Sequence, residues 1–140
     1  MNNFSTYFKN ITQAEYHSVY KRLEKYNLVN GQANLLAIIK ENNGLTQNEL
    51  ASILNVKGSS MSERINKLEA LGYIFRMVDD ENLRCKRIYI TTEGKKAAVQ
   101  CNRILNEFDE RMFSGFTKKD KKIFLGYLEK MMENLNIKNE

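Results

Sequence analysis

Residues 46–92 constrain the fold more than any other stretch, because they predict a helix, a tight turn, a second helix and a charged β-hairpin. The first helix has one short apolar face, formed by Leu50, Ala51 and Leu54. The second has an apolar stripe at helical spacing, formed by Met61, Ile65, Leu68 and Leu71. Two short amphipathic helices joined by a tight turn are typical of a helix-turn-helix.

The second helix is polar on the side opposite its apolar stripe. Its short hydrogen-bonding or charged side chains there are Ser59, Ser60, Ser62, Glu63, Arg64, Asn66 and Lys67. A helix that packs crosswise on a shorter partner and is polar outside suits insertion into a DNA major groove. The two helices alone fit an ordinary αα-corner with a solvated face equally well.

The predicted hairpin favours the DNA-binding interpretation. A β-prone run covers residues 73–78, and a return strand covers residues 87–91. Between these strands lies a polar tip. Three cations, Arg84, Lys86 and Arg87, follow on the returning limb of the hairpin. Such a wing can lay Arg84 along a minor groove, with Lys86 or Arg87 on nearby phosphates, while the helix reads the major groove. We therefore expect a mainly α fold with a small β-hairpin wing, a winged helix-turn-helix, whose partner is double-stranded DNA.

The composition agrees with a basic, globular chain. Its 140 residues suffice for one domain, or for one small domain with a helical extension, and 42% of them are hydrophobic. The net charge of +5 and the pI near 9.2 favour a polyanionic partner. The chain has no apolar run of about 18 residues, and its first ten residues lack the apolar core of a signal peptide. We expect a cytoplasmic protein that does not enter a membrane.

Enzymatic and metal-binding functions have no motif behind them. The sequence contains no glycine-rich phosphate loop, no Gly-x-Ser-x-Gly elbow and no His-Glu-x-x-His. Cys85, Cys101 and the single histidine, His17, are too few for a metal site. Both thiols are expected to be reduced, although a redox role for Cys85 between Arg84 and Lys86 stays open. We expect no cofactor and no enzyme.

Helices are also predicted on both sides of the winged segment. Apolar side chains recur at helical spacing within residues 4–26, 35–39, 98–112 and 123–135. Capping signals mark Thr46, Thr92 and Thr117 as helix starts. We expect a dimerisation helix in residues 1–30, the winged helix-turn-helix in 31–91 and dimerisation helices in 92–140. The terminal helices are too apolar for a monomer of this size, so they either interleave with a second copy or wrap their own wing domain.

The order of elements and several motifs resemble the MarR family (multiple antibiotic resistance regulators). The motifs lie at Leu50-Ala51, in residues 68–74 and in the wing, where residues 76–79, 84–87 and 90–94 resemble the family's wing signature. The resemblance spans nearly the whole chain. It implies a homodimeric transcriptional regulator, commonly a repressor that a small aromatic or phenolic ligand releases from DNA.

The chain departs from that family pattern at two positions. The family often has an acidic residue two positions before the wing arginine, where this chain has Asn82. The guanidinium of Arg84 would then be held by a neutral hydrogen bond, or by Asp79 or Asp80. The family also often has a basic residue where this chain has Glu63, which can accept a hydrogen bond from cytosine N4. Glu63 therefore puts an operator sequence inherited from the family in doubt, but not DNA binding itself.

The effector site and one alternative function stay open at the level of sequence. Tyr16, His17 and Tyr20 lie on the first helix, and an imidazole near aromatic rings can hold a carboxylate or phenolate. His17 fits an ordinary packed or solvated helix residue as well. Because Glu63 is acidic and the positive charge is mild, the wing domain also fits a protein-interaction module without sequence-specific DNA binding.

Overall fold

A computed structural model describes residues 3–137, apart from the side chain of Asn30. The chain begins with a continuous helical stretch made of α1 (Phe4–Glu15), a π-helical turn η1 (Tyr16–Tyr20), α2 (Lys21–Leu23) and a 3₁₀ turn η2 (Glu24–Tyr26). It ends at Asn27, whose φ of 57° is the left-handed conformation that asparagine tolerates at a helix end. The predicted helix over 4–26 is confirmed, and the π-helical turn is an addition to it.

The predicted helix-turn-helix and wing are present. After α3 (Asn30–Glu41) come a short strand β1 (Leu45–Thr46), α4 (Gln47–Leu54) and α5 (Gly58–Ala70). Strands β2 (Ile74–Val78) and β3 (Lys86–Ile90) form the hairpin. The sheet order is β1-β3-β2 and all pairs are antiparallel, so β1 completes a three-stranded sheet that the sequence did not predict.

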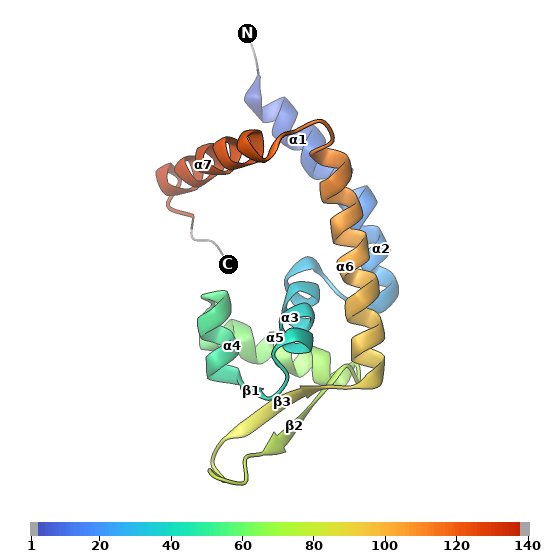
Figure 1. The fold of residues 1–140 in the computed structure, drawn as a ribbon, viewed down its shortest axis with the longest axis vertical. Helices are drawn as coiled ribbons and strands as arrows, with labels where there is room; N and C mark the ends of the chain where they lie inside the picture. The colour runs from blue at the N-terminus through green and yellow to red at the C-terminus, as the bar shows by residue number, and fades with distance from the viewer. Residues whose placement is uncertain (1–2, 138–140) are drawn as a thin grey trace.

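Two long helices complete the chain, α6 (Thr92–Met112) and α7 (Lys118–Asn134). The N-cap of α6 is Thr91, whose hydroxyl accepts a hydrogen bond from the Gly94 amide, so the prediction of Thr92 as the cap was wrong by one residue. Thr117 caps α7 as predicted, in a capping box with Asp120. At the far end of α6 the chain turns, and α7 lies at the opposite end of the molecule from the wing (Figure 1).

One apolar core holds the middle of the molecule together. It includes the inner faces of α3, α4 and α5 and the inward residues of the sheet, and Val19 and Leu23 reach it from the N-terminal stretch. The first half of α6 contributes Ala97, Ala98, Cys101 and Ile104. Since α6 is anchored in this core, the position of the wing is fixed relative to the long helix. We call the part from α3 to β3 the wing lobe.

In contrast, α1 and α7 have no buried residue. Their large exposed apolar side chains are Phe4, Tyr7, Phe8, Ile11, Ile123, Phe124, Leu125, Tyr127 and Met131. Within the described residues, no helix is both long enough and apolar enough to cross a membrane.

Candidate nucleic-acid interface

Helix α5 is held by its apolar side and presents its polar side outward. Met61, Ile65 and Leu68 are fully buried against the core. The side chains of Ser59, Glu63 and Lys67 are exposed, and Ser60 is half-buried. This periodicity leaves a row of polar groups along the outside of the helix, which is the arrangement that an α-helix needs in order to read base edges in a major groove.

Ser62 is tied to the preceding helix. The Gln47 side-chain amide, on the first residue of α4, donates a 2.6 Å hydrogen bond to Ser62 Oγ. A hydroxyl has one proton and two lone pairs, so this contact uses one lone pair of Ser62 and leaves its proton available to donate. The contact fixes α4 and α5 relative to each other and orients the Ser62 hydroxyl.

Arg64 lies against the start of α3. A Cβ atom built on Gly31 would come within 3.2 Å of Arg64 Cζ, so the guanidinium packs closely over this glycine. Gly31, Ser60, Glu63 and Arg64 line an open pocket of about 320 Å³ between α3 and α5. An alanine at position 31 would require the Arg64 guanidinium to shift by a few tenths of an ångström.

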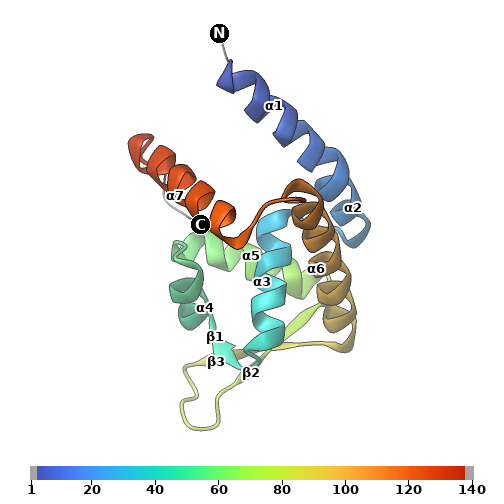
Figure 2. The same ribbon diagram turned by 45° about the horizontal axis from the view of Figure 1, so that its top comes forward.

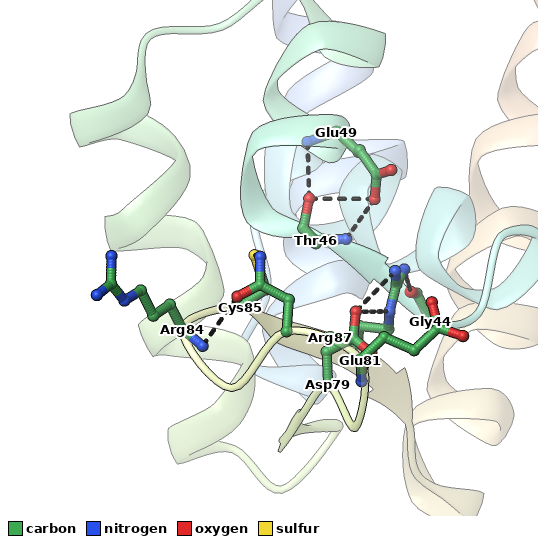
Figure 3. A network of polar contacts seen from close by, with 9 residues as sticks. Gly44, Thr46, Glu49, Asp79, Glu81, Arg84, Cys85 and Arg87 are labelled. Carbon is green, nitrogen blue, oxygen red and sulfur yellow. Dashed lines mark hydrogen bonds and ion pairs between the residues drawn. The ribbon is translucent and has the colours of Figure 1, made fainter.

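The two arginines of the wing have different surroundings. Arg87 pairs with Asp79 at 2.9 Å and donates a 2.9 Å hydrogen bond to the Gly44 carbonyl, so it ties the hairpin to the loop before β1. Arg84 is exposed, and its side chain extends away from this network (Figure 3). Among the described residues, neither Arg84 nor Lys86 has a carboxylate within ion-pair distance.

The electrostatics of the Asp79–Arg87 pair follow from these contacts. The Glu81 amide donates to Asp79 and, together with the guanidinium of Arg87, holds the pKa of the Asp79 carboxyl below its ordinary value. The same pair raises the pKa of Arg87. Both groups therefore stay charged at neutral pH, and Arg87 serves the protein's own structure in the free chain.

Asn82 shapes the wing tip through the backbone. Its Oδ1 accepts from the Arg84 amide at 3.2 Å, and its Nδ2 donates to Cys85 Sγ at 3.3 Å. A neutral contact from Asn82 to Arg84 is present, but it holds the main chain and leaves the guanidinium free. Of the two acidic residues expected as alternatives, Asp79 pairs with Arg87 instead, and Asp80 forms no ion pair with Arg84 among the described residues.

Arg76 is part of this surface and was not among the predicted site residues. Its Nε lies 3.2 Å from Glu69 Oε2, and its guanidinium also donates to Asn66, so it joins β2 to the outer side of α5. With Arg84 and Lys86 it lines an open pocket of about 300 Å³ between the wing and the start of α4. The wing signature contains Arg76, but its link to α5 depends on a contact across the fold.

The three candidate effector residues lie together on the π-helical turn. The Tyr16 ring is 5.4 Å from the His17 ring and 6.2 Å from the Tyr20 ring, measured between centroids. Tyr16 and His17 are exposed and Tyr20 is half-buried. None of them lines the two pockets described above. Their role in ligand binding stays a prediction.

The cysteines differ in their surroundings. Cys101 is buried in the core, and burial raises the pKa of its thiol to about 11, so it stays protonated at neutral pH. Cys85 is half-buried in the wing. Within the described residues, no group of three or more histidine, cysteine or acidic side chains could hold a metal ion.

Comparison with known proteins places this interface in a family. The sequence profile of the MarR family matches residues 26–84, which span α3 to the wing tip. The HTH-type transcriptional regulator YybA of Bacillus subtilis, itself uncharacterized, is 32% identical over 108 residues, which are 77% of this chain and 72% of YybA.

Solved structures agree over nearly the whole chain. The S. aureus MepR–DNA complex superimposes with a TM-score of 0.75 at 27% identity and covers 95% of this chain and 96% of MepR. The transcriptional regulator SlyA gives a TM-score of 0.75 at 25% identity, over 96% of this chain and 94% of SlyA. The relatives are transcriptional regulators and not enzymes. The chain therefore belongs to the MarR family of DNA-binding transcriptional regulators.

Proposed function

We propose that the chain acts in the cytoplasm as a homodimeric repressor that binds a pseudo-palindromic operator through α5 and the wing. The observation that carries this proposal is the pairing of an outward polar helix with a wing arginine, Arg84, whose guanidinium has no ion-pair partner among the described residues. A structural relative with a TM-score of 0.75 has been solved as a complex with DNA, which supports the same use of this surface here.

The contacts of the free chain divide the interface residues into two groups. Arg84 and Lys86 carry charges that no described carboxylate neutralises, so they are the groups that bind phosphates or enter the minor groove. Ser59, Ser60, Ser62, Glu63, Arg64 and Lys67 are proposed to face the major groove. Arg87 is engaged with Asp79 and Gly44, and it contributes to DNA binding by holding the wing in place.

The proposed dimerisation is supported by α1 and α7, which have no buried residue in the single chain. Helices α1 and α7 each expose several large apolar side chains. An ordinary monomer exposes such residues singly and not in groups of this size. Both helices lie at the end of the molecule away from the wing, so a second copy docked there leaves both wings accessible (Figure 1). A two-fold dimer then meets two major grooves one helical turn apart.

Relief of repression is proposed to come from a small aromatic or phenolic ligand. Tyr16, His17 and Tyr20 supply rings and one titratable imidazole on a π-helical turn, a feature often found at functional sites. Replacement of His17 by Ala should weaken the response to an aromatic acid and leave operator binding intact.

Selection of bound sites from random duplex DNA tests the function most broadly. The full chain should enrich a two-fold symmetric sequence, and a library of small aromatic acids should contain members that reduce this enrichment. Recovery of no common sequence would contradict the proposed operator binding. An enriched sequence that no ligand affects would contradict only the relief mechanism.

A protein-interaction role is the second candidate, because β2 exposes Phe75, Met77 and Val78. Salt dependence separates the two functions. Binding to DNA weakens steeply with salt through counterion release, whereas an apolar protein contact does not.

A further inference from the structure

A second basic surface lies outside the DNA-binding interface. Four cations, Lys21, Arg22, Lys25 and Arg103, converge on an open pocket of about 380 Å³ between the N-terminal helical stretch and α6. Tyr26 and Ile104 also line it. We call this the basic pocket. Its volume lies within the range of about 300–1,000 Å³ that is typical of small-molecule sites.

The described carboxylates balance the four cations of the basic pocket only in part. Glu107 accepts from Arg22 at 2.8 Å and from Arg103 at 2.8 Å, so one carboxylate holds both guanidinium groups. These two contacts hold the pKa of Glu107 below its ordinary value. In the described part of the chain, Lys21 and Lys25 have no carboxylate within ion-pair distance, and nearby Glu24 pairs with neither.

This arrangement suits an anion with more than one charge. Glu107 fixes both guanidinium groups at the rim, and each still has donors that face elsewhere. The two lysines are one helical turn apart on the same side of the stretch, so their charges repel each other in the empty pocket. An anion placed among the four cations relieves that repulsion, and the Tyr26 and Ile104 side chains offer apolar contact to an organic body.

The basic pocket is away from the proposed reading surface. In both ribbon views α2 and α6 lie on one side of α3, and α4 lies on the other (Figures 1 and 2). Lys21, Lys25 and Arg103 therefore do not extend the interface formed by the wing, α4 and α5. A ligand here would touch both the N-terminal stretch and α6, the helix that joins the wing lobe to α7.

We propose that the basic pocket binds a small organic polyanion, a phosphate ester or a polycarboxylate with at least two negative charges. Lys21 and Lys25 bind the anionic groups directly, and Arg22 from the N-terminal stretch and Arg103 from α6 supply further donors. None of its residues belongs to the wing or to α5, so the double variant described below should leave operator recognition unchanged.

Calorimetric titration of the full chain with sodium pyrophosphate and, separately, with citrate tests this site. Ionic strength is held constant with sodium chloride, so that general screening does not change during the titration. Saturable binding of one anion per chain is expected for at least one probe. Binding of pyrophosphate alone assigns a phosphate ligand, and binding of citrate alone assigns a polycarboxylate.

The double variant Lys21→Gln/Lys25→Gln should weaken that binding at least about tenfold, or 1.4 kcal/mol. The matched control, Lys118→Gln/Lys119→Gln, removes the same charge from exposed positions of α7 and should bind as the wild type does. Circular dichroism checks that both variants are folded. Absence of saturable binding of either probe, or equal weakening in the two double variants, would overturn the proposal.

The same double variant also separates this site from DNA binding. Its affinity for a selected duplex should keep the wild-type salt dependence. A salt slope reduced by the lysine substitutions, with anion binding unaffected, would instead assign the basic pocket to the DNA interface. The anion titration uses no DNA, so its result can be interpreted even if the chain does not bind an operator.

Discussion

At the scale of single residues, Arg84 and Arg87 have similar sequence contexts and opposite structural roles. Both lie on the basic return of the hairpin, and either could be expected to reach DNA. In the fold, Arg87 donates hydrogen bonds to Asp79 and to the Gly44 carbonyl, whereas the Arg84 side chain is exposed at the wing tip. The partner that distinguishes them, Gly44, is 43 residues away in sequence, so local pattern could not assign the two roles.

Arg87→Ala should therefore destabilise the wing. We expect a lower urea midpoint for unfolding at neutral pH, because the substitution removes both the ion pair and the hydrogen bond to Gly44. The pKa of Asp79 is lowered in the folded state, so its contribution is present above the ordinary carboxyl pKa and is lost as pH falls through the folded value.

The difference in urea midpoint between the wild type and Arg87→Ala should accordingly shrink as pH falls below about 4. Asp79→Asn should reproduce part of the loss at neutral pH, and the two substitutions together should cost less than their sum. A difference that stays constant down to acid pH would show that the ion pair does not anchor the wing.

Gln47 is a second residue whose role follows from one contact. Because its amide donates to Ser62 Oγ, the Ser62 proton is available to a base acceptor such as guanine O6 or thymine O4. In Gln47→Glu the carboxylate accepts that proton, and Ser62 is left to accept from adenine N6 or cytosine N4. Selection of sites from random DNA should show a changed preference at one base pair of each half-site, by about 1 kcal/mol.

Gln47→Ala is the control for this prediction. It should relax the preference at that base pair without reversing it, because the hydroxyl can then rotate freely. The same preference in the wild type and in both variants would mean that Ser62 does not read a base.

At the scale of elements, periodicity and caps predicted most of the fold. The apolar stripe of α5 and the capping box at Thr46 are local features, and both are confirmed. Strand β1 is only two residues long and is defined by pairing with Ile88 and Arg87, so no local signal marks it. The π-helical turn η1 lies inside a continuous helical stretch. The spacing of apolar side chains in the sequence does not distinguish such a turn from an α-helix.

The junction between the wing and α6 depends on Gly94. A Cβ atom there would collide with the Tyr73 carbonyl and lie 2.8 Å from Ile90 Cγ1, so the first turn of α6 fits closely over the end of the hairpin. Gly94→Ala should lower the free energy of unfolding by about 1–3 kcal/mol, as overpacking of a tight site does.

Gly126→Ala serves as the matched control, since a Cβ on that α7 residue meets nothing within 4 Å in the single chain. Alanine there should stabilise the chain by about 0.5–1 kcal/mol, because it is the better helix former. Urea unfolding of both variants measures the two effects. Equal effects of the same sign would contradict the close fit at Gly94.

At the scale of the whole molecule, the apolar residues of the core and those of α1 and α7 have different structural roles. The core joins α3 to β3 with the N-terminal stretch and the start of α6, so it builds one rigid reading unit. Helices α1 and α7 add no buried residue to that unit. The amphipathic pattern predicted such helices, but sequence alone left open whether they would wrap their own chain.

We expect the chain to be an obligate dimer through α1 and α7. Sedimentation at micromolar concentration should give twice the mass of the chain, and the melting temperature should rise with protein concentration. Substitution of exposed Tyr127 and Leu125 by Asp should shift the chain toward monomer or unfold it, whereas Lys130→Asp on the same helix should not. A stable wild-type monomer would remove the geometric basis for a symmetric operator.

The central claim is that α5 and the wing bind duplex DNA, and the salt dependence of that binding tests it most directly. Affinity for a selected duplex is measured by fluorescence anisotropy across a range of salt concentrations, for the wild type, Arg84→Ala and the control Lys119→Gln. The wild type should lose affinity steeply with salt, and Arg84→Ala should reduce the log–log slope by about two, one phosphate contact per subunit. Lys119→Gln, on α7, should keep the wild-type slope. A wild type without salt-sensitive binding to any duplex, or an Arg84→Ala variant with unchanged affinity and slope, would contradict the claim.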